Sequence, residues 1–438
     1  MKNTLLLILS VTTLLNAQSL KTSLEDVIST NPIILERLSN YNSVKEEITA
    51  AKSGYYPKLD LSLGVGYEKT DRDNTSFDFK VYQNSLKYTQ NVFNGFETTY
   101  RVQQQKSKTL SSAYSYIEKV NSTSFDLVNS YLQVMKNHEL LQTAKENVEI
   151  NQIVLIKVEK LYKAGLTTLS EVNKIKASLY LAKSNYVVQE NTLLDAQYSL
   201  QKTLGKDINN SYMSRPQLNV ELPLTIQEAQ EFALKNNPSL LISEYNIKLS
   251  KASYKEKKAA YYPKIDLEVS QTLNHNLNAI QGDENRFRAM AYVKYNLFNG
   301  FSDKSSIQKG ISKIQQEKES KDTIRRDIIE ELKLSYSAYE KLTDQLKHLQ
   351  SYKEFSHQTL QLYTKEYDLG RRSLLDLLSA QNDFIGSKSQ IINTEYNLLF
   401  AKYRIIDSMG ILVSSVINNN DIHYTNVGLK DLVTNNTN

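Results

Sequence analysis

The 438-residue chain contains no cysteine and no tryptophan, and it has only six prolines and 13 glycines. Without cysteine it has no disulfides, no thiolate metal sites, no cysteine nucleophile and no lipid anchor on an N-terminal cysteine. The formal net charge is +5, too small at this length to indicate a nucleic-acid partner. What remains is a polar chain that is 40% hydrophobic, and we expect it to fold.

Long hydrophobic runs are also absent. The longest extends from Leu5 to Leu15 and follows the positively charged Lys2. A bilayer-spanning helix needs about 20 apolar residues, so this run is too short and instead has the form of a secretory signal. The sequence therefore predicts a signal peptide at residues 1–17, an exported protein and no transmembrane helix.

The motifs of enzymes are missing as well. The five histidines lack metal-ligand spacing, and residues 71–74 (DRDN) lack the downstream glutamate of a calcium loop. No phosphate-binding loop or Gly-x-Ser-x-Gly sequence occurs, and Gly64-Val65-Gly66 has no third glycine at the required place. We therefore expect no enzymatic activity, no metal and no cofactor.

An internal duplication dominates the chain. The sequence YYPKLDL at residues 55–61 recurs as YYPKIDL at 261–267, an offset of 206, and FNGF at 93–96 recurs at 298–301, an offset of 205. Three further pairs keep one of these offsets: Asn31-Pro32 with Asn237-Pro238, Gly165 with Gly370, and Gly205 with Gly410. Because chance matches would scatter their offsets, the chain consists of two related halves.

Long helices follow from the scarcity of proline and glycine. Residues 98–161 contain neither and would span roughly 96 Å as a helix. After Gly165, positions alternately three and four residues apart form a heptad seam, which is typical of a coiled coil. Its members are Val172, Ile175, Leu179, Ala182, Tyr186, Gln189, Leu193, Ala196 and Leu200. Adding 205 gives a matching seam in the second half, so we expect helices at 96–162, 169–204, 301–367 and 374–409.

The turns between these helices, at residues 162–171 and 367–376, predict two helical hairpins. Gly165 and Gly370 allow the left-handed conformation that commonly ends a helix. Thr168 or Ser170 in the first turn, and Ser373 in the second, can cap the next helix. Both hairpin tips should then lie at one far end of the molecule.

Four shorter segments alternate between apolar and polar residues, at about 58–68, 80–92, 264–273 and 286–297. Leu59, Leu61 and Leu63, for example, point to one face. Such alternation over about 10 residues is the weak signature of a transmembrane barrel strand. A soluble antiparallel sheet packed on one face gives the same pattern.

Two features favour the membrane. Each strand pair leaves a helix and returns to one, so the helix–strand junctions lie on one side, where aromatics form a candidate membrane-interface girdle. This girdle comprises Tyr55, Tyr56, Phe93, Phe96, Tyr261, Tyr262, Phe298 and Phe301. Moreover, four strands cannot close a barrel and open edges are not tolerated in lipid. Two chains would give a plugged barrel, whereas three would give twelve strands with room for a channel.

With these motifs the chain resembles the TolC family of trimeric outer-membrane efflux proteins over nearly its whole mature length. The resemblance implies an α+β membrane protein, a homotrimer whose twelve-stranded barrel in outer-membrane lipid continues into a helical coiled-coil tunnel in the periplasm. It also implies a periplasmic adaptor (membrane fusion) protein and an energised inner-membrane pump of the ABC or RND type as partners.

The family's entrance residues can be matched singly. Arg372, Glu171 with its neighbour Ser170, and Tyr367 fall on residues that hold the entrance shut in the family. Asp376 falls on the first of two constriction aspartates, and the second is replaced by Ser379. The tip residues expected to contact the adaptor are Gly165, Leu166, Thr167, Gly370 and Arg371.

The predicted function is thus the exit duct of a tripartite efflux or type I secretion system. A periplasmic coiled-coil structural or adaptor protein is the alternative, and a passive porin is disfavoured by the long helices. Whether the substrate is a drug, a metal or a secreted protein stays open. The predicted division is a signal peptide at 1–17, a first repeat at 18–205, an equatorial linker at 206–224, a second repeat at 225–410 and an equatorial segment or flexible tail at 411–438.

Overall fold

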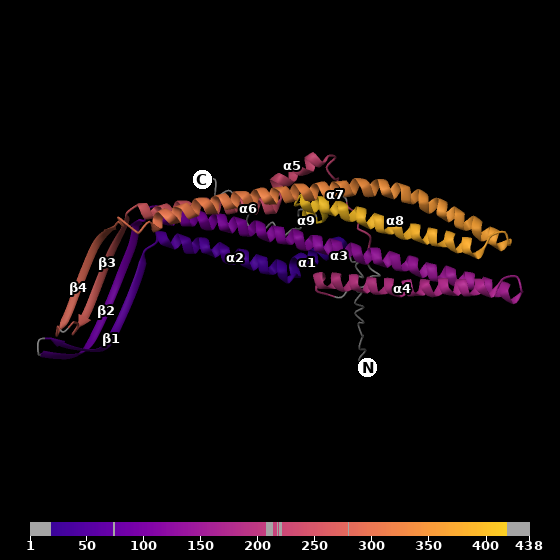
Figure 1. Ribbon diagram of the computed structural model, residues 1–438. Coiled ribbons are helices and arrows are strands. Elements are labelled where there is room, and N and C mark those ends of the chain that lie inside the picture. The colour runs from indigo at the N-terminus through magenta and orange to yellow at the C-terminus, as the bar shows by residue number, and fades with distance from the viewer. Residues whose placement is uncertain are drawn as a thin grey trace, which may run out of the picture. The chain divides into compact units, whose positions relative to one another are not determined.

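The structure, a computed structural model, describes residues 19–72, 75–206, 213–216, 218, 221–278 and 280–417 (Figure 1). The predicted signal peptide, much of the predicted linker and most of the predicted tail lie outside these residues. The first series of elements is α1 (Leu20–Thr30), α2 (Pro32–Lys52), η1 (Ser53–Tyr55), β1 (Lys58–Arg72), β2 (Thr75–Phe93), α3 (Glu97–Lys163) and α4 (Leu169–Leu204). The second is α5 (Ile226–Asn236), α6 (Pro238–Lys257), η3 (Lys258–Tyr261), β3 (Lys264–His275), β4 (Asp283–Lys294), α7 (Ser302–Asp368) and α8 (Leu374–Ser408), followed by α9 (Leu412–Val416).

The chain divides into two compact units, and each contains segments of both repeats. We call them the hairpin unit, made of the described residues of Met1–Leu35, Glu118–Asn237 and Asp327–Tyr424, and the strand unit, made of those of Glu36–Ile117 and Pro238–Arg326. The duplication therefore does not produce two side-by-side domains. Each unit is instead assembled from corresponding parts of the two halves.

The strand unit is built on one antiparallel sheet in the order β1-β2-β3-β4, with β1 and β4 at its edges (Figure 1). The register places Leu61 opposite Leu86, and Val269 opposite Ala289. Since directly paired residues lie on the same face of a sheet, one face is mainly apolar. Asp60, opposite Lys87, belongs to the polar face, in agreement with the alternation in the sequence.

The strand ends differ from the sequence prediction. β1 and β2 run beyond the predicted strand limits at residues 68 and 80, because their antiparallel pairing continues as far as Arg72↔Thr75. β4 ends at Lys294, although its alternation continues to Leu297. The last pair of β3 and β4 is Lys264↔Lys294, so residues 295–297 have no strand opposite them in the described chain.

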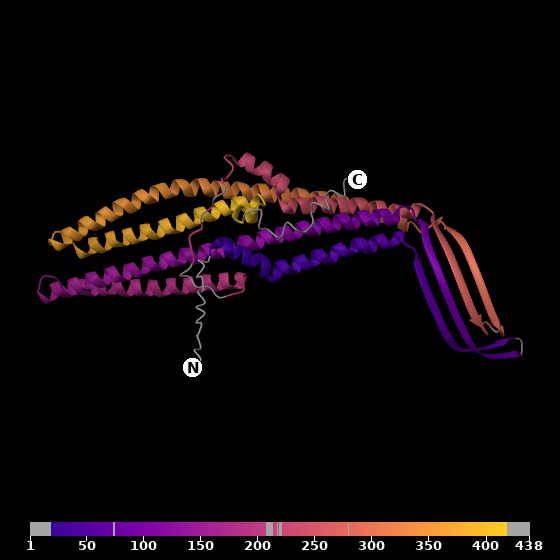
Figure 2. The same cartoon turned by 180° about the vertical axis from the view of Figure 1, so that it is seen from behind.

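In the hairpin unit, α3 and α4 form one helical hairpin and α7 and α8 form the other, and the two tips lie side by side in both views (Figures 1 and 2). The bounds of all four helices are within one residue of the predicted ranges. Of the predicted seam in α4, Tyr186 and Gln189 are partly exposed and the other seven residues are buried. Gln189 of the seam donates a hydrogen bond to Asn137 of α3 at 3.2 Å. Ser178, next to the seam, donates one to Asn151 of α3 at 2.7 Å.

The repeated Asn-Pro pair has a structural role. Asn31 donates a side-chain hydrogen bond to the carbonyl of Thr203 at 3.0 Å, and Asn237 donates one to the carbonyl of Ser408 at 2.9 Å. Each bond satisfies a carbonyl in the last turn of a helix, where no intrahelical donor is available. The prolines that follow occupy the first position of α2 and α6, where their missing N–H costs nothing.

Three further observations concern helices. No element was predicted at α1, α2, α5 or α6, although Leu24 and Val27 of α1 are fully buried. The predicted flexible tail begins with a helical turn, α9, whose Leu412 and Val413 are also fully buried. Among the described residues, no helix combines the length and the apolar composition needed to cross a membrane.

Candidate functional site

The tip of the second hairpin carries an ion pair on an aromatic ring. Gly370 adopts the left-handed conformation (φ +68°) that ends α7, and Ser373 caps α8 by accepting a hydrogen bond from the Asp376 amide at 3.2 Å. Between them, Arg372 binds Glu366 at 2.7 Å, and its guanidinium lies 4.1 Å from the centre of the Tyr363 ring. Arg372 is thus oriented by its own hairpin.

The tip of the first hairpin has the same backbone but no ion pair of this kind. Gly165 has φ +72°, and Thr168 caps α4 by accepting a hydrogen bond from the Glu171 amide. The Glu171 carboxylate accepts a hydrogen bond from the Thr167 hydroxyl, an arrangement that also favours the start of a helix. Leu166 is 74% exposed at the outermost turn.

A shared hydrophobic core joins the two tips. It contains Leu155, Val158, Val172, Ile175, Leu179, Tyr367, Leu374, Leu377 and Leu378. Tyr367 is 8% exposed, and its hydroxyl has no hydrogen-bond partner in the described chain. Burial, and then the negative charges of Glu171 and Asp368, raise the pKa of Tyr367 above its ordinary value. Tyr367 therefore stays neutral and anchors the second tip in the core.

Near the tips, an ion pair connects the two hairpins directly. Lys157 of α3 binds Asp368 of α7, and its ammonium group lies 5.9 Å from the centre of the Tyr367 ring. Neither residue was singled out from sequence, because partners 211 positions apart carry no local signal. Glu366 was not singled out from the sequence either. It lies six residues before Arg372, on the other side of the glycine turn, and this spacing could have indicated the ion pair.

The remaining predicted entrance residues are at the surface of the second helices. Ser170 and Ser379 are exposed, and Asp376 is half-buried at the start of α8, where its carboxylate accepts a hydrogen bond from Ser373 at 2.8 Å. A carboxylate in the first turn of a helix is stabilised by the helix dipole. Arg371, at the exposed end of the tip, is well placed for contact with another protein.

The predicted girdle residues lie at the helix–strand junctions of the strand unit. Phe93 and Phe96 pack edge to face at 5.4 Å, and Phe298 and Phe301 do the same at 5.5 Å. Phe96 and Phe301 have positive φ angles of 65° and 64°, so the duplicated FNGF sequence makes the same turn twice. Phe93 is half-buried, whereas Phe96, Phe298 and Phe301 are exposed, as are Tyr55, Tyr56, Tyr261 and Tyr262.

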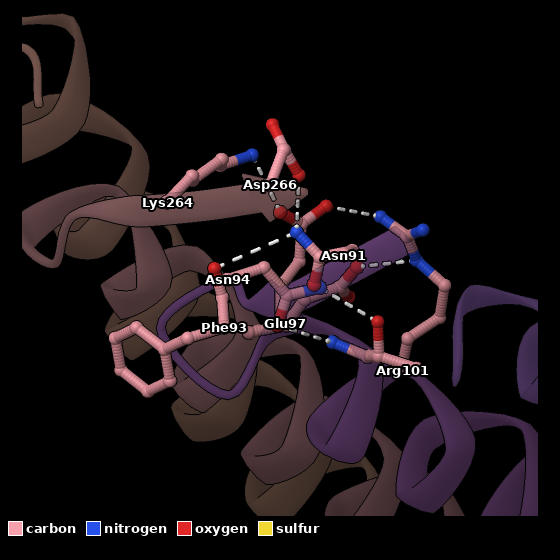
Figure 3. A network of polar contacts seen from close by, with 9 residues as sticks. Asn91, Phe93, Asn94, Glu97, Arg101, Lys264 and Asp266 are labelled. Carbon is pink, nitrogen blue, oxygen red and sulfur yellow. Dashed lines mark hydrogen bonds and ion pairs between the residues drawn. The ribbon is translucent and has the colours of Figure 1, made fainter. Parts of the chain in front are cut away.

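A polar network links the two repeats at one of these junctions (Figure 3). Glu97 accepts hydrogen bonds from Lys264 at 2.8 Å and from Arg101, which also binds Glu256 at 3.0 Å. Burial opposes the ionisation of Glu97, but the bonds and charges of Lys264 and Arg101 outweigh it and lower its pKa. The first repeat is thus tied to the second by hydrogen bonds between charged side chains.

The described residues include no group of three or more His, Cys, Asp or Glu side chains arranged to hold a metal ion. The features that the structure does bring together are a pair of polar helical tips and a sheet with an aromatic rim.

Comparisons with known proteins agree with this description. Residues 24–206 and 230–410 match the family described as "Outer membrane efflux protein". The outer membrane protein TolC of Escherichia coli (strain K12) is 20% identical over 87% of this chain and 80% of its own length. The outer membrane efflux protein BepC of Brucella suis biovar 1 is 20% identical over 83% of this chain and 79% of its own.

Among solved structures, the CmeC outer membrane channel of Campylobacter jejuni superposes with a TM-score of 0.80. The match covers 95% of this chain and 89% of that chain at 14% identity. At this level of identity the superposition shows a shared fold.

Proposed function

The chain belongs to the outer membrane efflux protein family, and from that premise we propose that three copies form a closed duct with a gate at the helical tips. Its function is that of an outer-membrane efflux channel in a tripartite system. The single observation that carries the proposal is the four-stranded sheet with one apolar face and two unpaired edge strands.

Closure by three copies follows from the chemistry of that sheet. The apolar face includes Leu59, Leu61, Leu63 and Val65, each at least 67% exposed. Such a surface is unfavourable in water and suits lipid, but in lipid the edges of the sheet must also be paired. Three copies supply twelve strands, which is enough for a barrel with an open lumen.

The gate is proposed to lie at the two tips, through Arg372, Glu171, Tyr367 and Asp376. Arg372 and Glu366 form an ion pair on the surface of the second tip, and Glu171 and Asp376 begin the second helices. In a ring of three copies these groups would repeat threefold around the passage. Charged groups repeated around a pore control both its closure and its ion selectivity.

The partners are proposed by analogy with the relatives. A duct without an energy source needs a transporter in the inner membrane, and an adaptor protein to bridge the periplasm. Leu166, Thr167 and Arg371 are exposed or half-exposed on the outermost turns, so we assign the adaptor contact to them.

Single-channel recording in planar bilayers tests the gate. Arg372→Ala should raise the conductance of the purified protein because it removes the charged anchor at the second tip. Arg371→Ala is the matched control, since it removes the same charge from the neighbouring exposed position and should leave the conductance near the wild-type value. Unchanged conductance in Arg372→Ala, or equal increases in both variants, would refute the assignment of the gate to Arg372.

A further inference from the structure

The contact between the two repeats inside one chain contains information about the contact between chains. At the internal junction, the end of β2 lies against the start of β3. Asn91 donates a hydrogen bond to Asp266 at 2.8 Å, and Phe96 packs edge to face on Tyr262 at 6.2 Å. Gly95 fits so closely that an added Cβ would lie 2.7 Å from the carbonyl oxygen of Ala259. Figure 3 shows Asn91 and Asp266 facing each other at this junction.

The same residue types stand at the two free edges of the sheet. The counterparts of Asn91, Gly95 and Phe96, at an offset of 205, are Asn296, Gly300 and Phe301 after β4. The counterparts of Asp266 and Tyr262, at an offset of 206, are Asp60 and Tyr56 around the start of β1. Both halves of the internal contact are therefore present a second time, but within one chain they cannot meet because β1 and β4 are opposite edges of the sheet.

The second set of residues is more exposed than the first. Gly95 is buried, whereas a Cβ added to Gly300 would meet nothing within 4 Å. Phe93 is half-buried, whereas its counterpart Phe298 is 72% exposed. The Gly300 turn still has the left-handed φ of +54°, so its backbone has the conformation for the contact although no described residue lies within 4 Å of a Cβ added there.

The early end of β4 also reflects a missing neighbouring strand. In β2, pairing with β1 stops at Thr89, and the residues from Gln90 to Phe93 are strand only because β3 lies beside them. In β4, pairing with β3 stops at Lys294, and the corresponding residues 295–298 are not strand. They lack the neighbour that their counterparts have.

We infer that β1 of a second copy of this chain pairs with β4 in the register that β2 and β3 use, so that Asn296 of one copy bonds Asp60 of the next. This inference rests on the proposed trimer and specifies which residues meet in it. The register follows when each residue of an internal pair is replaced by its counterpart in the other repeat. Adding 205 to the β2 residue and subtracting 206 from the β3 residue converts the pair Asn91↔Asp266 into Asn296↔Asp60. The same conversion turns Thr89↔Glu268 into Lys294↔Ser62.

Side chains that played no part in deriving this register fit it. On the polar face, the large Tyr292 and Met290 stand opposite Gly64 and Gly66 of the next copy, and Arg288 stands opposite its Glu68. Tyr292 faces Gly64 in this register, and aromatic side chains facing edge glycines are a known way to stabilise strand pairing. Gly66 leaves room for Met290, because a Cβ added to Gly66 would meet nothing within 4 Å in a single chain.

The apolar face of the same pairing is complementary in size. Ala291 stands opposite Val65 and Ala289 opposite Tyr67, so small side chains meet large ones. Shifting the register by one residue would bring apolar side chains to the polar face. Shifting it by two would move Arg288 from Glu68 to Gly66 or to Thr70.

The proposed contact between copies has fewer polar links than the contact between the two repeats. At the internal junction Glu97, Arg101 and Glu256 form a charged network. Their counterparts at the free edges are Ser302, Ser306 and Ala50, which cannot form one. The contact between copies therefore keeps the Asn–Asp hydrogen bond and the aromatic packing but lacks the ion pairs.

Cysteine crosslinking tests the register, because the chain has no native cysteine. Four substitutions give four pairings: Asp60→Cys or Ser62→Cys, each combined with Lys294→Cys or Asn296→Cys. Directly opposite positions lie within disulfide reach, whereas diagonal neighbours are about 7–8 Å apart. Full-length protein in outer membranes is oxidised with copper phenanthroline and resolved without reductant.

The in-register pairs, 60 with 296 and 62 with 294, should give dimers and trimers that reductant removes. The shifted pairs, 60 with 294 and 62 with 296, should give about tenfold less, because their Cα atoms are too far apart. The control Asn91→Cys with Asp266→Cys should link within one chain and give no larger species. Having two in-register pairs keeps the test decisive if one double variant fails to reach the membrane.

More product from a shifted pair than from both in-register pairs would overturn the inference. So would the absence of intermolecular product while the 91–266 control links. Native mass spectrometry of the unmodified protein in detergent separates these failures from a failure of the proposed function. A trimer that does not link in register retains the duct and refutes the register, whereas a monomer refutes both.

Discussion

The two helical hairpins come from one duplicated sequence, yet their tips differ in chemistry. Both end their first helix at a left-handed glycine and begin their second with a capping hydroxyl, from Thr168 in one and Ser373 in the other. In the first tip, Thr167 binds Glu171, and in the second, Arg372 binds Glu366 over Tyr363. The duplication has therefore kept the residues that shape the backbone, while the surface side chains of the two tips have diverged.

The largest expected difference between the hairpins concerns Leu374 and its counterpart Leu169. Leu374 is 1% exposed in the shared tip core, whereas Leu169 is 55% exposed. Leu374→Ala should lower the free energy of unfolding by about 2–5 kcal/mol, and Leu169→Ala by less than about 1 kcal/mol. Urea unfolding of the detergent-solubilised protein, followed by circular dichroism, measures both. Equal losses would mean that a neighbouring copy covers Leu169, and the contrast would then hold only within a single chain.

The ends of the second helices differ in their response to pH. Burial, then the negative charges of Glu331, Asp126 and Glu118, raise the pKa of Asp407 in α8 from 3.8 to about 7. Its counterpart in α4 is Lys202. Because the pKa is raised in the folded state, the stability contributed by the protonated group is complete below pH 4. It is lost as pH rises through 7.

Asp407→Asn should therefore stabilise the protein at pH 8 relative to wild type, and much of this gain should disappear by pH 5. A shift of three units corresponds to at most about 4 kcal/mol over the full pH range. Thermal unfolding at the two pH values measures the effect, and Asp195→Asn at an exposed site of α4 is the control. An equal gain at both pH values would show that Asp407 is ionised throughout.

A smaller effect is expected from the ion pair that distinguishes the second tip. Glu366→Gln should lower the thermal midpoint slightly at low salt and not at high salt, because surface ion pairs are weak and are screened. Leu161→Gln introduces the same side chain at the corresponding position of the first tip and should show no salt dependence. If the thermal midpoints of the two variants respond alike to salt, the Glu366–Arg372 pair adds no electrostatic stability to the second tip.

The smallest effect concerns the two tyrosines that precede the turns. Tyr367 is buried with a hydroxyl that has no partner in the described residues, whereas Tyr162 is 43% exposed. Tyr367→Phe should change stability by less than about 1 kcal/mol, and in the stabilising direction, since it removes a buried polar group without a partner. Tyr162→Phe should have no effect. A clear loss of stability in Tyr367→Phe would indicate that the hydroxyl has a partner in another copy.

The long helices and their turns could be predicted closely because their determinants are local. The absence of proline and glycine from 98–161 and the glycines at 165 and 370 fix where the helices run and end. The helices α2 and α6 could not be found in the same way, although their Asn-Pro starts were noticed. The role of Asn31 and Asn237 depends on carbonyls about 170 residues away, which sequence spacing does not reveal.

Strand ends and side-chain partners were harder to predict because they depend on neighbours. The extension of β1 to Arg72 and the end of β4 at Lys294 are set by which strand lies alongside. At the tips, Arg372, Glu171, Tyr367 and Asp376 could be named from the family resemblance. Their partners Glu366, Thr167 and Ser373 could be assigned only once side-chain positions were known.

The sequence by itself determined the duplication, the lengths of the helices, the two faces of the strands and the family, because each depends on spacing within the chain. The tertiary structure decided which residues are buried and which side chains contact one another. It showed that Tyr367 is buried while Tyr162 is exposed. It also showed that Asn91 reaches Asp266 of the other repeat, while Asn296 accepts a local hydrogen bond from the Phe298 amide two residues further on. Burial and pairing depend on which surfaces come together in space, and that is why two nearly equal halves could acquire different roles.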